Sequence, residues 1–286
     1  MIMDVLVHYG EIGLKGKNRG FFEDVLINNI RNRVKIKDVR KDEKRILFNT
    51  DDDKIEDVLK NTFGITSFSF VDVIESKEDI ILDKVEELIN GFKIKSLGLE
   101  TSRSDKKFPL TSVELNKKIG DITNKKGIKI NFSNPEKRIF TEITSKNAYI
   151  YTEKIKGKGG LPVGVSGKVT LLFSGGIDSA VAAYLLMKRG CRVDFLHFHA
   201  LPKNGDVVDS KVMNIIEILK KYQSKIKLYL VPYHNYQLST MDKIKESSDV
   251  VVFRNFMLKF GVEISKRTGC KAIGTGDNLG QVASQT

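Results

Sequence analysis

The chain has 286 residues, of which 41% are apolar and 29% charged, and its formal net charge is +12. This composition is globular and the length suits two or three domains, while no apolar run is long enough to cross a bilayer and no secretory leader is recognisable. The cysteines, Cys191 and Cys270, lie far apart, which excludes a disulfide framework or a Cys-x-x-Cys metal site. We therefore expect a cytoplasmic protein without membrane attachment or a thiolate metal site. Its basic charge suggests a polyanionic partner.

The first 75 residues alternate strand and helix patterns. The predicted elements are a strand at 4–8, a helix over 22–30 with Asn18 as candidate N-cap, strands at 35–40 and 45–49, a short helix at 55–59 and a strand at 65–73. The order βαββαβ is typical of a ferredoxin-like domain, in which two helices accompany a four-stranded sheet.

Residues 76–165 predict a second α+β unit. Ser76 and Asp79 are candidate caps for a helix that ends at Gly91, and Thr111 and Glu114 have capping-box spacing before a second helix. Strands are predicted at 96–101, 128–132, 138–144 and 148–155. The glycine-rich stretch 157–167 is the predicted joint to the next domain.

Residues 166–286 predict repeated β and α units. A continuous apolar strand at 169–173 precedes a helix that ends at Gly190; strands follow at 192–199, 226–232 and 271–275, and helices at 211–221 and 252–267. This alternation favours a doubly wound parallel sheet, whose ligand crevice lies beyond the carboxyl ends of the strands.

The motif Ser174-Gly-Gly-Ile-Asp-Ser179 stands where the first of these strands turns into its helix. Glycines allow a tight turn and a close approach of the backbone, and the free amides of a first helical turn bind anions such as pyrophosphate. An ordinary strand-to-helix turn with a polar cap is the alternative, but six agreeing positions favour phosphate binding. The motif resembles the PP-loop of ATP pyrophosphatases. That resemblance implies that Ser174, Gly175, Gly176, Asp178 and Ser179 hold ATP phosphates, with Asp178 catalytic and near Mg²⁺.

Further blocks extend the resemblance along the chain, namely 9–19, 106–112, 157–164, 187–191, 197–199 and 274–286. Together they resemble the tRNA 4-thiouridine synthetase family, also called tRNA uracil 4-sulfurtransferases. The resemblance implies a ferredoxin-like domain at 1–75, a THUMP RNA-binding domain at 76–165 and a PP-loop domain at 166–286, which we expect to be shortened at its C-terminus. It further implies an ATP pocket bordered by Leu172, Phe173, His197 and Phe198 and completed by Arg254, Gly276 and Gln285. Packing at a strand end is an equally good account of His197 and His199.

Basic residues concentrate in the predicted THUMP domain, where positions 91–130 hold ten basic and four acidic side chains. A solvated charged face would account for this, but the THUMP resemblance favours RNA, whose phosphates would bind such a surface in a salt-dependent way. The predicted RNA-binding residues are Lys15, Lys17, Arg19, Arg103, Lys106, Lys107, Lys117 and Lys118.

The implied reaction is adenylation of a tRNA uridine at O4 by ATP, followed by displacement with sulfur to give 4-thiouridine, AMP and pyrophosphate. The implied partners are tRNA, a persulfide or sulfide donor such as a cysteine desulfurase, and a second copy of the chain in a homodimer. Core packing is the favoured role of both cysteines, so no catalytic cysteine is assigned. The alternatives are a tRNA-binding THUMP protein with incomplete catalysis and a PP-loop sulfur-transfer enzyme in thiamine thiazole synthesis.

Overall fold

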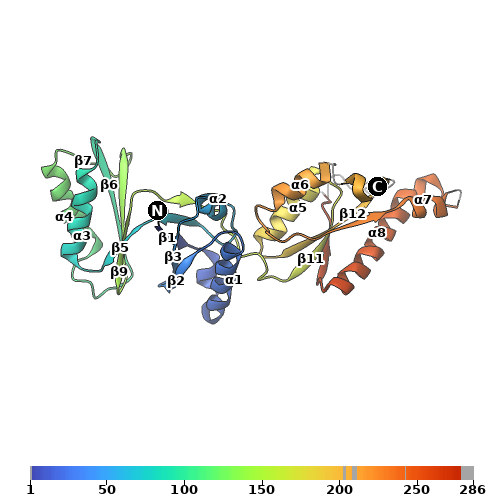
Figure 1. Ribbon diagram of the computed structural model, residues 1–286, viewed down its shortest axis with the longest axis horizontal. Coiled ribbons are helices and arrows are strands. Elements are labelled where there is room, and N and C mark those ends of the chain that lie inside the picture. Colours follow the sequence, from blue (N-terminus) through green and yellow to red (C-terminus); the bar gives the residue numbers. More distant parts are fainter. Residues whose placement is uncertain (1, 202–203, 208–210, 242, 278–286) are drawn as a thin grey trace. The chain divides into compact units, whose positions relative to one another are not determined.

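The computed structural model (Figure 1) describes residues 2–201, 204–207, 211–241 and 243–277. These residues form two compact units. The first unit contains the described residues up to Tyr9, together with Val34–Glu56 and Ile65–Gly157. The second contains Gly10–Arg33, Asp57–Gly64 and the described residues from Lys158 onward. The segments between strands of the first sheet are therefore part of the second unit.

The first unit is built from two sheets. Its strands and helices are β1 (Met3–His8), β2 (Lys37–Asp42), β3 (Arg45–Thr50), β4 (Ser67–Phe70), β5 (Asp72–Glu75), α3 (Glu78–Asn90), β6 (Ser96–Arg103), α4 (Ser112–Lys125), β7 (Lys129–Ile130), β8 (Lys137–Ile143), β9 (Asn147–Tyr151) and β10 (Ile155–Lys156). The first sheet has the order β10-β4-β1-β3-β2 and the second the order β5-β9-β8-β6-β7.

The first sheet confirms the ferredoxin-like fold. Strand β1 lies between β3 and β4 and is antiparallel to both, and β2 pairs with β3 at one edge. A fifth strand, β10, comes from much later in the chain and pairs with β4. The predicted single strand 65–73 is wrong, because the chain leaves this sheet after β4. The Val71 amide still donates to the Asp4 carbonyl, and then β5 pairs with β9 in the second sheet.

The second sheet and its two helices form the THUMP-type α+β part of the unit. Helices α3 and α4 lie on one face of this sheet (Figure 1), and side chains such as Val85 and Leu115 are fully buried with those of the strands. The predicted capping box holds: Thr111 Oγ1 accepts from the Glu114 amide, and Glu114 Oε2 accepts from the Thr111 amide. The predicted caps of α3 do not form, since its N-cap is Lys77 and no side chain caps it.

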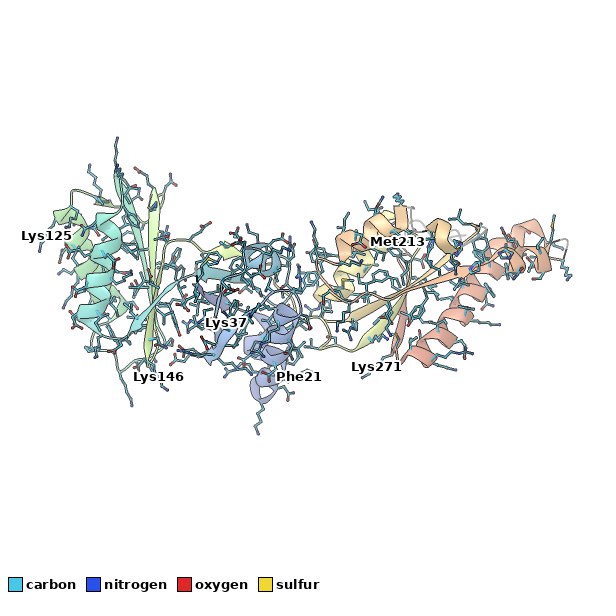
Figure 2. All side chains as sticks on the ribbon, viewed as in Figure 1. Phe21, Lys37, Lys125, Lys146, Met213 and Lys271 are labelled. Atoms are coloured by element: carbon cyan, nitrogen blue, oxygen red, sulfur yellow. The ribbon has the colours of Figure 1, made fainter. Side chains whose placement is uncertain are left out.

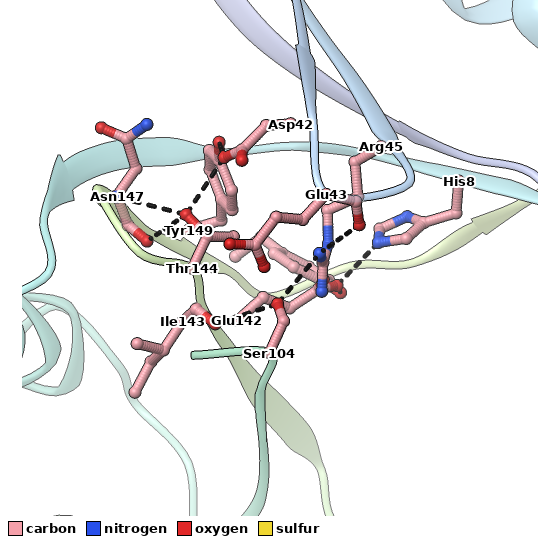
Figure 3. A network of polar contacts seen from close by, with 11 residues as sticks. His8, Asp42, Glu43, Arg45, Ser104, Glu142, Ile143, Thr144, Asn147 and Tyr149 are labelled. Carbon is pink, nitrogen blue, oxygen red and sulfur yellow. Dashed lines mark hydrogen bonds and ion pairs between the residues drawn. The ribbon is translucent and has the colours of Figure 1, made fainter. Parts of the chain in front are cut away.

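A buried polar network joins the two sheets of this unit (Figure 3). Glu142 on β8 accepts from Arg45 Nε at 2.5 Å and from the Tyr151 hydroxyl at 2.6 Å, and it contacts His8 Nε2 at 2.8 Å. Burial acts to raise the pKa of Glu142, but the hydrogen bond and charge of His8, the charge of Arg45 and the Tyr151 hydroxyl outweigh it and lower the pKa to about 2. The carboxylate is therefore held ionised between the sheets.

The second unit contains an all-parallel sheet of order β13-β12-β11-β14. Its elements are η1 (Glu11–Leu14), η2 (Gly16–Asn18), α1 (Arg19–Arg31), β11 (Lys168–Leu172), α5 (Ile177–Lys188), β12 (Arg192–His199), η3 (Asn204–Val207), α6 (Lys211–Leu219), β13 (Leu228–Pro232), α7 (His234–Thr240), α8 (Glu246–Thr268) and β14 (Ala272–Gly274), and α2 (Ile55–Lys60) runs into it. Asn18 is the N-cap residue of α1, as predicted, but its side chain makes no capping hydrogen bond to the helix.

Helices cover both faces of the parallel sheet, which confirms the doubly wound arrangement (Figure 1). On one face Leu171 and Phe195 pack with α5 and α6. Alternate residues face the other way, where Ser265 Oγ of α8 donates to Thr170 Oγ1 at 2.8 Å. Helix α7 was not predicted from the sequence. No helix of the described residues is long and apolar enough to cross a membrane.

Candidate functional site

A cavity of about 380 Å³ lies beyond the carboxyl ends of the parallel strands. It is lined by Leu172, Phe173, Ser174, Ser179, Leu196, Phe198, Tyr233, Val250, Phe253, Arg254, Met257, Leu258, Thr275, Gly276 and Asp277. This is where an open parallel sheet binds its ligand. Seven of the predicted ATP-site residues lie in this lining: Leu172, Phe173, Ser174, Ser179, Phe198, Arg254 and Gly276.

The turn after β11 requires its first glycine. Gly175 has φ +78°, and an added Cβ would lie 2.8 Å from Val212 Cγ2 of α6. The Ser174 hydroxyl accepts from the Gly176 amide at 3.2 Å, and the Ser179 hydroxyl donates to the Gly176 carbonyl at 2.9 Å. These contacts fix the loop, and the first-turn amides of α5 then begin at a rigid turn beside the cavity.

Gly276 lies directly against this phosphate-type loop. An added Cβ at Gly276 would be 2.6 Å from both the amide nitrogen and the Cα of Ser179. Atoms that are not bonded do not approach so closely, so only a glycine fits at this contact. The segment after β14 is therefore seated on the first turn of α5, and it forms one wall of the cavity.

Charge in the described lining comes from a single pair. Arg254, on α8, donates from Nη2 to Asp277 Oδ2, and each side chain is 40% exposed. Asp178 is exposed in the first turn of α5, next to Ser179, and does not line the cavity. An exposed carboxylate at this place is open to a cation shared with phosphate oxygens.

His197 does not face the cavity. Its side chain is 9% exposed, and Nδ1 is 2.7 Å from the Phe173 carbonyl oxygen, which ties the ends of two neighbouring strands together. Burial lowers the pKa of His197, the hydrogen bond to Phe173 opposes this effect, and the neighbouring His199 lowers the pKa further. A neutral packed histidine results. Gln285 lies outside the described residues.

Aromatic residues after β13 and on α8 also line the cavity, and this was not predicted from the sequence. Tyr233, after β13, packs against Phe253 of α8 with ring centroids 4.9 Å apart, and Phe253 also contacts Tyr236 of α7. Both Tyr233 and Phe253 line the cavity. Their spacing in sequence resembles ordinary core positions, so only the position of Tyr233 directly after a parallel strand could have indicated them.

The predicted RNA-binding residues divide between the two units. In the first unit Lys106, Lys107 and Lys117 are exposed, and Lys118 is paired with Glu78. Arg103 instead donates to the carbonyls of the 106–112 loop, at Phe108 and Leu110, both at 3.0 Å. Lys125 and Lys146, near two ends of this unit in Figure 2, add exposed positive charge.

Three of the predicted residues belong to the second unit. Lys17 is exposed, whereas Arg19 is paired with Glu23 at 3.4 Å and Lys15 lies over the Phe22 ring at 5.2 Å. In the same loop Glu11 accepts both of its hydrogen bonds from Arg189, at the end of α5, each at 3.0 Å. Part of this loop thus serves packing, and Lys17 is its freest cation.

Neither cysteine lines the cavity, and burial raises the pKa of the Cys191 thiol. The geometry as a whole defines a class of protein: an α/β nucleotide-binding domain with a PP-loop-type turn, combined with ferredoxin-like and THUMP-type parts.

Comparisons with family models assign the same parts. Residues 4–69 match the model described as "ThiI ferredoxin-like domain", residues 75–153 match "THUMP domain", and residues 164–286 match "Thiamine biosynthesis protein (ThiI)".

Curated relatives match nearly the whole chain. A probable tRNA sulfurtransferase of Thermoanaerobacter sp. (strain X514) is 38% identical over 290 residues, covering 99% of this chain and 76% of the relative. One of Brevibacillus brevis is 36% identical, covering 99% and 73%. The chain belongs to this family of tRNA sulfurtransferases.

Solved structures agree with this assignment. A 4-thiouridine synthetase crystallised with RNA and bound ATP is 30% identical, with a TM-score of 0.84, and the match covers 100% of this chain and 76% of that one. PH1313 from Pyrococcus horikoshii is 29% identical, with a TM-score of 0.75 and coverage of 99% and 88%. The predicted fold class and family are confirmed.

Proposed function

We propose that this chain uses ATP to adenylate a uridine of tRNA at O4 and then replaces that oxygen with sulfur, giving 4-thiouridine, AMP and pyrophosphate. The observation that carries the proposal is the contact of Gly276 with the first turn of α5, which encloses a phosphate-type loop in the wall of a nucleotide-sized cavity. The likeness to a 4-thiouridine synthetase with RNA and ATP supports the choice of substrates.

The loop side chains suit a triphosphate. Amides at the start of α5, together with the hydroxyl of Ser174, would donate to phosphate oxygens, and Arg254 would add a charged donor. The Ser179 hydroxyl would keep the loop in place through its hydrogen bond to the Gly176 carbonyl. The apolar side chains of Leu172, Phe173 and Phe198 would border the adenosine. His197 would act only through the strand ends that it holds.

The residues present also fit magnesium. Mg²⁺ usually binds one or two carboxylates together with substrate phosphates and water. No group of three or more His, Cys, Asp or Glu side chains among the described residues could hold a metal by itself. Asp178 is the carboxylate that would hold the ion beside the phosphates, where Mg²⁺ would supply positive charge to offset that of the leaving pyrophosphate.

The reaction balances without a redox partner when the donor is hydrosulfide. Uridine O4 bonds to the α-phosphorus as the bond to the β-phosphate oxygen breaks, and N3 loses its proton. Hydrosulfide then bonds to C4, AMP leaves with O4, and the hydrosulfide proton ends on N3. The chain's contribution is positioning and charge stabilisation in both displacements.

RNA would be held by the exposed lysines of the THUMP-type part and by Lys17 of the second unit. Ten basic side chains between residues 91 and 130 supply a sequence-tolerant attraction to phosphates. A cysteine desulfurase as persulfide donor and a homodimer remain predictions from the family resemblance.

The test is mass spectrometry of nucleosides from unmodified tRNA incubated with the protein, ATP, Mg²⁺ and sulfide, with pyrophosphate measured in parallel. We expect 4-thiouridine and tRNA-dependent pyrophosphate from the wild type, and neither from Asp178→Ala. Glu217→Gln, an exposed carboxylate on α6, is the matched control and should behave as the wild type. Pyrophosphate release that ignores tRNA would contradict the proposal.

A second candidate function follows from the description of the family model that matches residues 164–286, a thiamine biosynthesis protein. The same adenylation and sulfur-transfer chemistry would then serve formation of the thiazole. A host that requires thiazole should grow without it when it expresses this chain, and should not grow when it expresses Asp178→Ala; this result would support the second function.

A further inference from the structure

Asp277, the partner of Arg254 in the cavity lining, has no part in the proposed reaction. Arg254 comes from α8 and Asp277 from the segment after β14, and both side chains line the cavity. Asp277 follows Gly276, whose backbone is pressed against Ser179, so the carboxylate is anchored to the phosphate-type loop itself. The pair therefore links α8 to the segment that lies against the loop, and both of its side chains line the cavity.

The ion pair between Arg254 and Asp277 opposes the binding of a phosphate at Arg254. Arg254 is the one cation in the described lining and Asp277 the one anion, so the lining carries no net charge from its side chains. The carboxylate occupies Nη2 of the guanidinium, and the fork of guanidinium donors is the group that recognises phosphate oxygens. A phosphate bound at Arg254 must displace the carboxylate or share the guanidinium with it.

We propose that Asp277 is an internal counter-ion that competes with phosphate for Arg254, and so weakens the binding of ATP and of pyrophosphate. The inference rests on the proposed use of ATP at this cavity. It assigns Asp277 a positioning role: the residue holds Arg254 between catalytic cycles and recaptures it as pyrophosphate leaves. If Asp277 only stabilised the fold, its removal would not increase the affinity for ATP or pyrophosphate.

The magnitude follows from exposure. Each partner is 40% exposed, and pairs of this kind couple by roughly 0.2–1 kcal/mol, which corresponds to a factor of up to about fivefold in an equilibrium constant. Removing the carboxylate also removes its repulsion of the phosphate oxygens, which acts in the same direction. We expect Asp277→Asn to bind ATP and pyrophosphate about fivefold more tightly than the wild type.

The experiment is equilibrium binding of Mg²⁺-ATP, and separately of inorganic pyrophosphate without metal, to the full chain. Asp277→Asn is compared with Glu263→Gln, which makes the same charge change at an exposed pair with Arg267 elsewhere on α8. Glu263→Gln should leave both affinities within twofold of the wild type. In an Arg254→Gln background the gain from Asp277→Asn should fall below twofold, because the competed group is gone.

Each outcome decides the question. Tighter binding of both ligands by Asp277→Asn, dependent on Arg254, supports the competition. Unchanged or weaker binding overturns it, and weaker Mg²⁺-ATP with unchanged metal-free pyrophosphate would identify Asp277 as a magnesium ligand instead. If the wild type binds neither ligand, the proposed function fails as well, which separates the two failures.

Discussion

Substituting Gly276 by alanine gives the sharpest test of the site. The added Cβ would lie 2.6 Å from the Ser179 amide nitrogen and Cα, whereas carbon atoms at van der Waals contact are about 3.5–4 Å apart. Both neighbours are backbone atoms, which cannot rotate away. The segment after β14 and the first turn of α5 must therefore separate by about 1 Å.

A shift of this size acts on the phosphate loop directly. Hydrogen bonds to phosphate oxygens require donor–acceptor distances of about 2.7–3.2 Å, and misplacement by about 1 Å in an active site can cost about 100-fold in rate. We expect kcat/KM for tRNA-dependent pyrophosphate release to fall about 100-fold in Gly276→Ala. Overpacking of this kind costs about 1–3 kcal/mol, so the protein should still fold and melt only somewhat earlier.

The assay compares pyrophosphate release, ATP affinity and thermal melting for Gly276→Ala and for Gly205→Ala. Gly205, on η3 of the same unit, has no atom within 4 Å of an added Cβ and should retain wild-type rates. Gly276→Ala with rates within threefold of the wild type would refute the reasoning, because the loop would then not depend on the seating of this segment.

Three further predictions concern other parts of the chain. Glu142→Gln should lower the free energy of unfolding by about 3 kcal/mol at neutral pH, because the pKa of Glu142 is depressed from 4.5 to about 2. This stability is fully present above pH 4.5 and is lost as the pH falls towards 2. The denaturant unfolding curves of the variant and the wild type should therefore converge near pH 2. Reversing Lys106 and Lys107 to glutamate should weaken tRNA binding and flatten its dependence on salt by about two units of slope, with ATP affinity unchanged in a direct titration. Phe63→Ala should destabilise the second unit by about 3–5 kcal/mol, seen as an earlier melting transition, whereas Phe21→Ala at an exposed site should not.

Local signals in the sequence predicted most elements of both units. The capping box of α4 and the strand-to-helix turn at 174–179 depend on neighbouring residues, and such signals survive without tertiary information. The division of 65–73 between two sheets could not be predicted from local signals. Strands β4 and β5 are nearly continuous in sequence, and each pairs with a strand far along the chain. The same applies to β10, whose two residues pair with β4.

The candidate site divides in the same way. Residues next to strand ends, such as Phe173, Phe198 and Gly276, were predicted and line the cavity. His197 shares a strand end with Phe198, but successive side chains of a strand point to opposite faces, and so it faces α5 and α6 rather than the cavity. The aromatic wall was missed because α7 has no clear apolar period and Phe253 reads as a core position.

Phe63 shows that the core of the second unit includes residues from outside the C-terminal part of the chain. Its side chain is 1% exposed and stacks on Tyr222 of the second unit at 5.3 Å, while the Tyr184 ring of α5 meets it edge-on at 5.1 Å. A backbone hydrogen bond next to Phe63 supports this packing, since the Gly64 amide donates to the Gly159 carbonyl at 2.8 Å. Removal of residues 1–165 would expose the rings of Tyr184 and Tyr222 beside the phosphate loop's own helix. Lost activity in such a fragment would therefore report a damaged core, and RNA dependence is better tested by surface substitutions in the full chain.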